Sequence, residues 1–507
     1  MANIAVKDMT SGSPAKLILG FFVPMVFGLL FQQLYNMVDT IIVGNYLGVQ
    51  ALASVGSTGS INFMIIGFCM GVCNGFAIPV AQKFGEKNFT QLRKFAANGA
   101  WLAVGFAIVM TTVVCLLCRR ILLWMNTPAD IIDGAYAYIF VIFLGIPATY
   151  LYNMVSGILR SLGDSRTPLY FLVMSSLMNV ALDLFTIVVL KMGVAGAAWA
   201  TVISQAVSGI ACLVFMAKQY DVLRMTKEEA APNGNIMKIL CGIGIPMGLQ
   251  YSITAIGSMV LQVAVNGLGS MAVAAMTAAT KISMFFCCPF DALGSTMATY
   301  GGQNIGAKRL ERLGEGMKAA VLMGIAYSLL ALAVLCQFGD RIALLFLDAD
   351  QVQILGQVKQ YLLTNAVFYI PLVLVNVVRF MIQGMGYSKR AVLAGVCEMA
   401  ARAGVGFLLV PYFGYTAVCF ASPFAWIAAD LFLVPSYLMI VKRLWKEQGM
   451  PAAPVEGKRM QGDGIGLRFF GMDIRKMGIL EIARSGIHWR WKEFRDEEST
   501  QTHRHYP

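Results

Sequence analysis

The sequence predicts an all-α polytopic membrane protein, in which twelve transmembrane helices form two six-helix bundles related by a pseudo-two-fold axis. Three observations support this fold class: the composition, the number of long apolar runs, and an internal duplication. The 507 residues are 58% hydrophobic and only 13% charged, whereas soluble globular domains carry about 25% charged residues. Such a chain needs lipid as its solvent, because a soluble core could not enclose so much apolar surface.

Twelve apolar runs have the length that crosses a bilayer, about 20 residues. They cover residues 17–44, 51–80, 95–117, 134–158, 168–190, 194–217, 238–266, 271–300, 319–338, 361–384, 391–411 and 415–441. The first run is too long for the apolar region of a cleavable signal peptide, so we interpret it as the first span.

The chain also contains an internal repeat. The hexapeptide Gln82–Lys87 returns in altered form 221 residues later as Gln303–Lys308, and the same shift aligns Leu47–Ala53 with Leu268–Ala274. A similar shift finds a second copy of Leu162–Arg166. Matched blocks in one order indicate a duplication. Because each copy holds six spans, an even number, both copies have the same orientation and surround a central site.

The duplication sets the expected domains and their orientation. We expect an N-terminal bundle over 1–217, an inter-lobe linker over 218–237, a C-terminal bundle over 238–445 and a tail over 446–507. Most Lys and Arg residues fall in loops on the side of the two termini, which predicts that both termini are cytoplasmic. The net charge of +12 then reflects loops that face an anionic leaflet, not nucleic-acid binding. The tail, which has no spanning run, is predicted to be disordered or to lie on the membrane surface.

Charged side chains inside the apolar runs are candidate functional residues, since a charge deep in a bilayer costs roughly 3 kcal/mol or more. One face of the first span carries Gln32, Tyr35, Asn36 and Asp39. In the fifth span, Asn179 and Asp183 are spaced i, i+4 and share a face. Two carboxylates that meet in a dry cavity repel each other and can share a proton near neutral pH. We therefore predict a coupling-ion site formed by Asp39, Asp183, Asn179, Thr201 and Tyr35; the alternative is that each aspartate caps a helix kink.

The second half has its own set of charged residues in apolar runs: Lys281, Asp291, Arg379, Glu398, Arg402 and Asp430. Glu398 and Arg402 are spaced i, i+4 with opposite charge, which predicts a structural ion pair or, alternatively, a gate or substrate contact. Lys281 is expected to neutralise a carboxylate or to line the cavity. The predicted substrate cavity contains Gln32, Asn36, Gln250, Lys281, Glu398 and Arg402. Arg160 and Arg166 are counted among the charges of cytoplasmic loops.

Other energy sources and chemistries find no support in the sequence. It contains no Walker A sequence, so ATP is not the energy source within this chain. The three histidines, His488, His503 and His505, all fall in the tail, so the bundle lacks the commonest metal ligand and general base. We expect a protein that is not an enzyme and has no cofactor, with H+ or Na+ as the coupling ion.

Five stretches of this sequence together resemble the multidrug and toxic compound extrusion family, called MATE, and its DinF-like bacterial branch. They are Asn36–Gly44, Gln82–Gly85, Leu159–Pro168, Asn179–Asp183 and Gly193–Thr201, and the resemblance covers about residues 10–445. It implies two six-helix bundles that form a V around a central cleft. It also implies export of cationic and amphipathic drugs in exchange for H+ or Na+, with an ion site that matches the residues predicted above.

The sequence departs from the family pattern in the seventh span, where some Na+-coupled members carry a glutamate. The stretch 246–254 has no carboxylate, which favours protons and leaves Na+ possible at Asp39, Asn179 and Asp183. We expect a monomeric antiporter of the cytoplasmic membrane that contacts lipid and small amphipathic or cationic molecules. The alternatives are a flippase for lipid-linked sugars on a related scaffold, an integral membrane enzyme and a channel.

Overall fold

The computed structural model describes residues 7–125, 127–344, 352–447, 468–469 and 472–473. Its elements are α1 (Pro14–Leu47), α2 (Val49–Ser57), α3 (Gly59–Gly85), α4 (Phe89–Trp124), α5 (Ile132–Leu144), α6 (Ile146–Ser161), α7 (Arg166–Leu184), η1 (Phe185–Val189), α8 (Val194–Gln219), η2 (Asp221–Leu223), α9 (Gly234–Asn266), α10 (Ser270–Gly306), α11 (Leu310–Ala343), α12 (Val352–Val367), α13 (Tyr369–Gly384), α14 (Ser388–Gly404), η3 (Val405–Leu409), α15 (Val410–Phe413), α16 (Tyr415–Glu447), β1 (Arg468–Phe469) and β2 (Met472–Asp473).

The chain divides into two compact units, one that ends at Arg443 and one that begins at Leu444. In the second unit the structure describes the short antiparallel pair of β1 and β2, in which Arg468 is opposite Asp473. The prediction that the tail is disordered or lies on a membrane surface otherwise concerns residues outside the described ranges.

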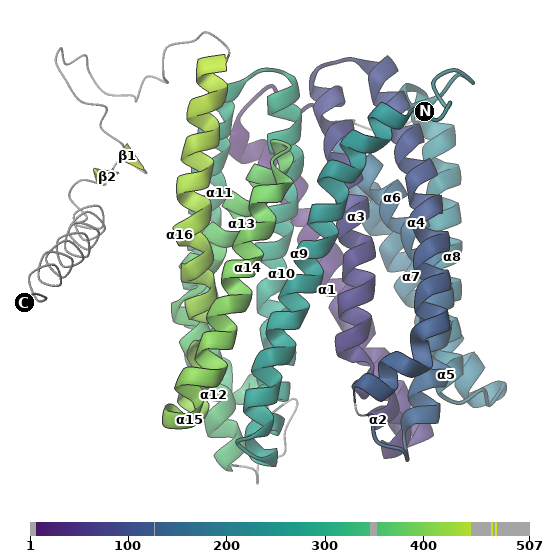
Figure 1. The fold of residues 1–507 in the computed structure, drawn as a ribbon, viewed down its shortest axis with the longest axis vertical. Coiled ribbons are helices and arrows are strands. Elements are labelled where there is room, and N and C mark those ends of the chain that lie inside the picture. Colours follow the sequence, from purple (N-terminus) through teal and green to yellow (C-terminus); the bar gives the residue numbers. More distant parts are fainter. Residues whose placement is uncertain (1–6, 126, 345–351, 448–467, 470–471, 474–507) are drawn as a thin grey trace, which may run out of the picture. The chain divides into compact units, whose positions relative to one another are not determined.

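The first unit is a bundle of membrane-spanning helices. Within the described residues, ten helices are long and apolar enough to cross a membrane, and two bent pairs bring the number of spans to twelve. This confirms the predicted all-α polytopic fold. The start of α1 and the end of α16 lie at the same end of the bundle, as an even number of spans requires, with α2 and α15 at the opposite end (Figure 1). We call the former the N-terminal end.

The two halves share their irregularities as well as their spans. Helices α5 and α6 meet at 44°, and α12 and α13 meet at 54°. Pro147 and Pro371 lie just after these two breaks, where a proline lacks the N–H of a helical hydrogen bond and crowds the preceding turn. Each half also contains one π-helical turn, η1 after α7 and η3 after α14. The sequence analysis predicted both bent spans as single runs, because an apolar run does not reveal a bend.

Helices α3 and α9, from different halves, pack closely through glycine. Gly71 and Gly75 on α3 face Gly244 and Gly248 on α9, and a Cβ on Gly75 would overlap with the Cα of Gly244. Pairs of small residues four positions apart allow helix backbones to approach each other in lipid, where close packing must supply the stability. The two halves are therefore joined along a helix pair and not only through the linker.

The first helix of each half begins against the other half. Ile236 and Leu240, in the first turns of α9, belong to the apolar core of the first half. Helix α1 contacts α10 and α11 of the second half as well as α7 of its own half. The domain boundaries proposed at 217 and 238 follow the sequence repeat and remain a prediction.

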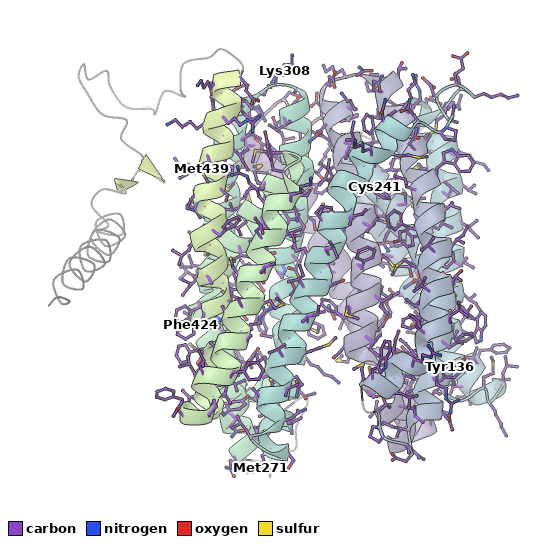
Figure 2. The ribbon with its side chains drawn as sticks, viewed as in Figure 1. Tyr136, Cys241, Met271, Lys308, Phe424 and Met439 are labelled. Atoms are coloured by element: carbon purple, nitrogen blue, oxygen red, sulfur yellow. The ribbon has the colours of Figure 1, made fainter. Side chains whose placement is uncertain are left out.

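The repeated hexapeptide forms a reciprocal connection between the halves. Gln82 Nε2 donates to the Gly384 carbonyl at 3.0 Å, and Gln303 Nε2 donates to the Ser161 carbonyl at 2.9 Å. These two hydrogen bonds occupy equivalent places in the two copies. Lys308, which follows Gln303, lies at the N-terminal end of the bundle, whereas Met271 lies at the opposite end (Figure 2).

Two glycines of the same repeat permit this contact. A Cβ on Gly85 would overlap with the carbonyl of Gln303, and a Cβ on Gly306 would overlap with the carbonyl of Gln82. The backbones of α3 and α10 thus meet without side chains between them. We call Gln82, Gly85, Gln303 and Gly306 the clasp. It closes the N-terminal end of the bundle between the two halves.

The segment of residues 7–12, here called the strap, is bound to the clasp. The Met9 N–H donates to Gln303 Oε1 at 2.8 Å, and the Met9 side chain is 1% exposed. Asn304 Nδ2 donates to the Met9 carbonyl at 3.3 Å, and Arg312 Nη2 donates to the Gly12 carbonyl at 2.9 Å. The strap precedes the first half in the chain but is held by the second.

The linker between the halves is held along α4. Arg93 Nε and Nη2 donate to the two carboxylate oxygens of Glu229 at 2.8 and 2.7 Å. The Asn233 N–H donates to Asn98 Oδ1 at 2.7 Å. Bidentate pairing favours the charged carboxylate, and the hydrogen bonds from Arg93 lower the pKa of Glu229 to about 2.

Replacing Gln303 with Ala should loosen both the clasp and the strap, because the side chain bonds to Ser161 and to Met9. A buried group left without its partner costs about 1–3 kcal/mol, so amide exchange in residues 7–12 should rise at least about fivefold. Hydrogen–deuterium exchange mass spectrometry measures this. Gln219→Ala, at an exposed glutamine, is the control, and unaltered exchange in Gln303→Ala would show that the clasp does not hold the strap.

The Arg93–Glu229 pair should make stability depend on pH. The pKa of Glu229 is lowered from 4.5 to about 2, so the pair stabilises the fold above pH 4.5 and loses this effect as the pH falls toward 2. The melting temperature of Glu229→Gln should therefore lie below that of the wild type at neutral pH, and the difference should shrink as the pH falls below 4.5. Glu228→Gln, at an exposed neighbour, should show no difference; a deficit independent of pH would contradict this account.

Candidate functional site

Asp39 on α1 and Asp183 on α7 face each other inside the first half. Their carboxyl groups are close enough to interact electrostatically, and two charged carboxylates at such a separation repel each other. Asp183 is 0% exposed. Neither Asp183 oxygen, nor Oδ1 of Asp39, has a hydrogen-bond donor among the described residues. The structure thus brings two carboxyl groups with unsatisfied oxygens to one buried point.

The other residues of the predicted ion site lie around this pair. Asn179 Nδ2 donates to Thr201 Oγ1 at 3.3 Å, and Thr201 Oγ1 donates to the Ala197 carbonyl at 3.1 Å. Asn179 Oδ1 has no donor among the described residues. Tyr35, one turn before Asp39 on α1, is within electrostatic range of both carboxyl groups. The turn η1 begins two residues after Asp183, and π-helical turns are frequent at functional sites.

Two residues next to this site, Tyr138 and Gln205, were not identified from the sequence. Tyr138 on α5 is within electrostatic range of both carboxyl groups and is 8% exposed. Gln205 on α8 lies within hydrogen-bonding range of Tyr35 and accepts from Thr149 Oγ1 at 3.1 Å. The sequence analysis weighted charged residues in apolar runs. A search for uncharged polar residues in the middle of the apolar runs would have found these two residues as well.

The oxygen atoms of this cluster suit a proton or a hard cation. Among the described residues, no group of three His, Cys, Asp or Glu side chains could hold a metal ion. A sodium ion at this point would therefore depend on the two carboxyl groups and the amide oxygen of Asn179, since hard cations take oxygen ligands.

The second half contains a buried charge cluster. The predicted pair of Glu398 and Arg402 is present with a separation of 3.9 Å, but the partner that hydrogen-bonds to Glu398 is Arg379 on α13. These three residues are 3%, 8% and 6% exposed, in that order. Asp430 on α16 lies within electrostatic range of Arg379 and Glu398, and neither of its oxygens has a donor among the described residues.

The remaining residues of the predicted substrate cavity are dispersed. Gln250 on α9 is 5% exposed and accepts from Gln383. Lys281 is exposed and forms no ion pair with a described residue, so the cation beside the buried carboxylate is Arg379 instead. Gln32 is half-buried near Tyr35, whereas Asn36 is exposed.

A small pocket of about 40 Å³ lies between the two halves, immediately inside the clasp. Its lining comes from α3, α6, α9, α10 and α13: Asn74, Ala77, Ile78, Ala81, Gly157, Arg160, Ser161, Met247, Ser295, Ala298, Thr299 and Phe380. None of the six residues predicted for the cavity is in this lining. The one charged lining residue is Arg160, whose Nη2 donates to Asn74 Oδ1 at 3.1 Å. Arg160, which was counted with the charges of the cytoplasmic loops, lies in the last turn of α6, because this helix extends through Ser161.

A family model described as MatE matches residues 24–185 and 246–408, which are the two copies of the repeat and together more than half of the chain. The chain belongs to the MatE family. MatE proteins are multi-pass membrane transporters and not enzymes, so the resemblance noted from the sequence is confirmed.

Curated relatives agree with this assignment. The MatE chain is 29% identical over 391 residues to the probable multidrug resistance protein YpnP of Bacillus subtilis, covering 76% of this chain and 85% of the relative. It is 26% identical over 348 residues to the probable multidrug resistance protein NorM of Listeria monocytogenes, covering 66% and 75% of the two chains.

Solved structures share the fold. A crystal structure of MATE in complex with MaL6 superposes with a TM-score of 0.82 at 24% identity, covering 88% of this chain and all of that one. The outward-facing conformation of a multidrug resistance MATE family transporter of the MOP superfamily also has a TM-score of 0.82, at 23% identity, covering 88% of this chain and 99% of that one. These likenesses establish the architecture of this MatE protein.

The buried pair of Arg379 and Glu398 gives a stability prediction. Removing one partner of such a pair costs about 3–5 kcal/mol, because the other charge is left buried and unpaired. Glu398→Leu should lower the melting temperature strongly, and Arg379→Met in the same protein should recover much of the loss.

The exposed pair of Lys359 and Asp340 is the matched control for this measurement. Asp340→Asn should change stability by less than about 1 kcal/mol. Thermal unfolding in lipid nanodiscs measures the melting temperatures of all these variants. Equal losses of melting temperature in Glu398→Leu and in the double variant would show that packing volume, and not charge, determines the effect.

Proposed function

We propose that this MatE protein is a cation-coupled antiporter that exports amphipathic, often cationic, compounds, with Asp39 and Asp183 as the site of the coupling ion. The observation that carries the proposal is the pair of neighbouring carboxyl groups, of which three oxygens are buried and lack donors among the described residues. Two charged carboxylates repel each other at this range in a medium of low dielectric constant. A bound proton or cation removes that repulsion, so the occupied and empty states differ in free energy.

The position of α1 can couple ion binding at Asp39 to the arrangement of the two halves. Helix α1 carries Asp39 and also contacts α10 and α11 of the second half. Pro24 lies inside it and Gly28 follows one turn later, where a helix bends most readily. A change at the carboxyl pair that tilts or bends α1 alters the contact between the halves. Antiport requires only that ion and substrate bind the two conformations with different affinities.

Protons fit the site better than Na+. Two neighbouring carboxyl groups are an arrangement that a shared proton stabilises, because the proton removes the repulsion between two negative charges. Na+ at Asp39, Asn179 and Asp183 is the alternative, with fewer ligands than hard cations usually take.

The orientation and the substrate class belong to the same proposal. Lys83, Lys87, Lys94 and Lys318 lie in or near the loops of the N-terminal end, which the positive-inside rule places in the cytoplasm. In this orientation the clasp closes the cytoplasmic side of the bundle. The proposal also places the protein in the cytoplasmic membrane as a monomer. The relatives' names support export of drugs. A flippase for lipid-linked sugars would need several cations for a pyrophosphate, whereas the pocket lining holds one.

The proposal is tested by replacing Asp39 with Asn in proteoliposomes that carry an imposed proton gradient. Proton-driven efflux of ethidium should fall at least about tenfold, because the pair can no longer change its charge with proton binding. Asp133→Asn, at an exposed aspartate, should leave efflux unchanged. Proton-driven efflux at the wild-type rate in Asp39→Asn would refute the assignment, and efflux driven by a Na+ gradient alone would identify Na+ as the ion.

A further inference from the structure

We propose that the strap, residues 7–12, is a latch that keeps the N-terminal end of the bundle closed, and that this end opens only after the strap has left the second half. The inference goes beyond the proposed function, because it assigns a role to a segment outside the ion site and the pocket. It rests on that function in one respect, since an antiporter must open each end of the bundle in turn.

Two arginines at the start of α11 hold the strap by its backbone. Arg309 Nη1 donates to the Thr10 carbonyl at 2.6 Å. Arg312 Nη2 donates to the Gly12 carbonyl at 2.9 Å and to the Met9 carbonyl at 3.4 Å. Among the described residues, neither arginine forms a salt bridge with a carboxylate. Because charged donors make the stronger hydrogen bonds, the second half holds the strap firmly without using its side-chain charges.

The strap is also attached to the first half. It leads directly into α1, which begins at Pro14. In the loop between α6 and α7, a Cβ on Gly163 would lie 2.0 Å from the Lys7 carbonyl, and the φ of Gly163 is +82°. Only glycine adopts this backbone conformation at such close range without strain. The strap therefore touches both halves within a few residues.

Asp8 gives the strap a defined shape beside the first half. Asp8 Oδ1 accepts from the Thr10 N–H at 2.8 Å, which is the hydrogen bond of an Asx turn. Asp8 also lines a pocket of about 350 Å³ together with residues of the corner between α3 and α4 and of η2: Phe84, Lys87, Phe89 and Val222. The strap is thus a hydrogen-bonded turn seated beside this corner.

The two attachments are too close along the chain to tolerate a widening gap between the halves. Lys7 packs on Gly163 of the first half, and the Met9 N–H donates to Gln303 of the second. Two residues of extended chain span at most about 7 Å. Opening of this end must therefore break one attachment. Because α1 joins the strap covalently to the first half, the hydrogen bonds to the second half are the ones that break.

The corresponding segment of the other copy is held more tightly. The 221-residue shift of the repeat places residues 228–233 of the linker opposite the strap. There Arg93 pairs with the carboxylate of Glu229, whereas the arginines of α11 donate to uncharged carbonyls of the strap. Bidentate pairing with a carboxylate is the stronger interaction, so the strap is the attachment that releases more readily.

Distances between spin labels test the latch without a transport assay. A non-canonical amino acid carries each label, because the chain has eleven cysteines of its own. One pair of labels, at the exposed positions Arg166 and Lys389, reports the opening of the N-terminal end between the halves. A second pair, at the exposed positions Ser11 and Lys318, reports release of the strap from the second half. Double electron–electron resonance measures both distances in nanodiscs without an ion gradient.

Arg309→Ala combined with Arg312→Ala removes three hydrogen bonds to the strap. The ratio of long to short distances should rise at least about fivefold for both label pairs, since an unmade hydrogen bond shifts an equilibrium severalfold. Arg309→Lys combined with Arg312→Lys keeps the charges and should restore part of the closed population. Lys318→Ala removes a charge from the exposed face of the same helix and should leave the distance between Arg166 and Lys389 unchanged.

Asp39→Asn separates this inference from the proposed ion coupling. In that background the arginine variants should still open the N-terminal end, because the latch does not use the carboxyl pair. The efflux measurements on Asp39→Asn decide the ion site, whereas the distance measurements decide the latch.

Three results would overturn the inference. Release of the strap with no lengthening between Arg166 and Lys389 would show that the strap is a passive neighbour of the clasp. No release of the strap in the double alanine variant would show that the two arginines do not hold it. In the wild type, lengthening between the halves without lengthening between Ser11 and Lys318 would show that the end opens while the strap stays bound, and this measurement needs no variant.

Discussion

The hydrogen bonds of Gln82 and Gln303 join the two halves at one end of the bundle, and much of the structure depends on this contact. Each glutamine donates to a backbone carbonyl of the opposite half, at a place where two glycines allow the backbones to meet. The strap binds to one of these glutamines, and the pocket lies directly inside them. Buried polar groups in a membrane protein must find partners within the protein. The clasp supplies such partners, because it joins the two halves and also binds the strap.

Charged side chains inside this bundle occur in different kinds of surroundings. Arg379 and Glu398 are buried and neutralise each other. Asp39 and Asp183 are like charges held close together, so a bound proton or cation would lower their repulsion. Arg160 is a half-buried charge beside a pocket and donates to the neutral amide of Asn74.

The two copies of the repeat share their backbone architecture but differ in their polar residues. The clasp, the bent spans and the π-helical turns occur in both copies. Two residues before η1 is Asp183, whereas two residues before η3 is Ala403, so the second copy has no counterpart of this carboxylate. In the second copy, Glu398 on α14 pairs instead with Arg379 on α13.

The sequence by itself determined the membrane-spanning fold and the duplication, and it singled out Asp39 and Asp183 of the proposed ion site, because hydropathy and helical spacing are local properties of the chain. Asp39 and Asp183 are 144 positions apart in the numbering, yet each was recognisable as a charge in an apolar run. Only the tertiary structure decided the partners. The pairing of Arg379 with Glu398 depends on how α13 and α14 meet within the second half. The hydrogen bond from Gln303 to Ser161 depends on how the two halves meet. The positions where α3 and α9 approach each other follow from packing between distant segments, which no local pattern records.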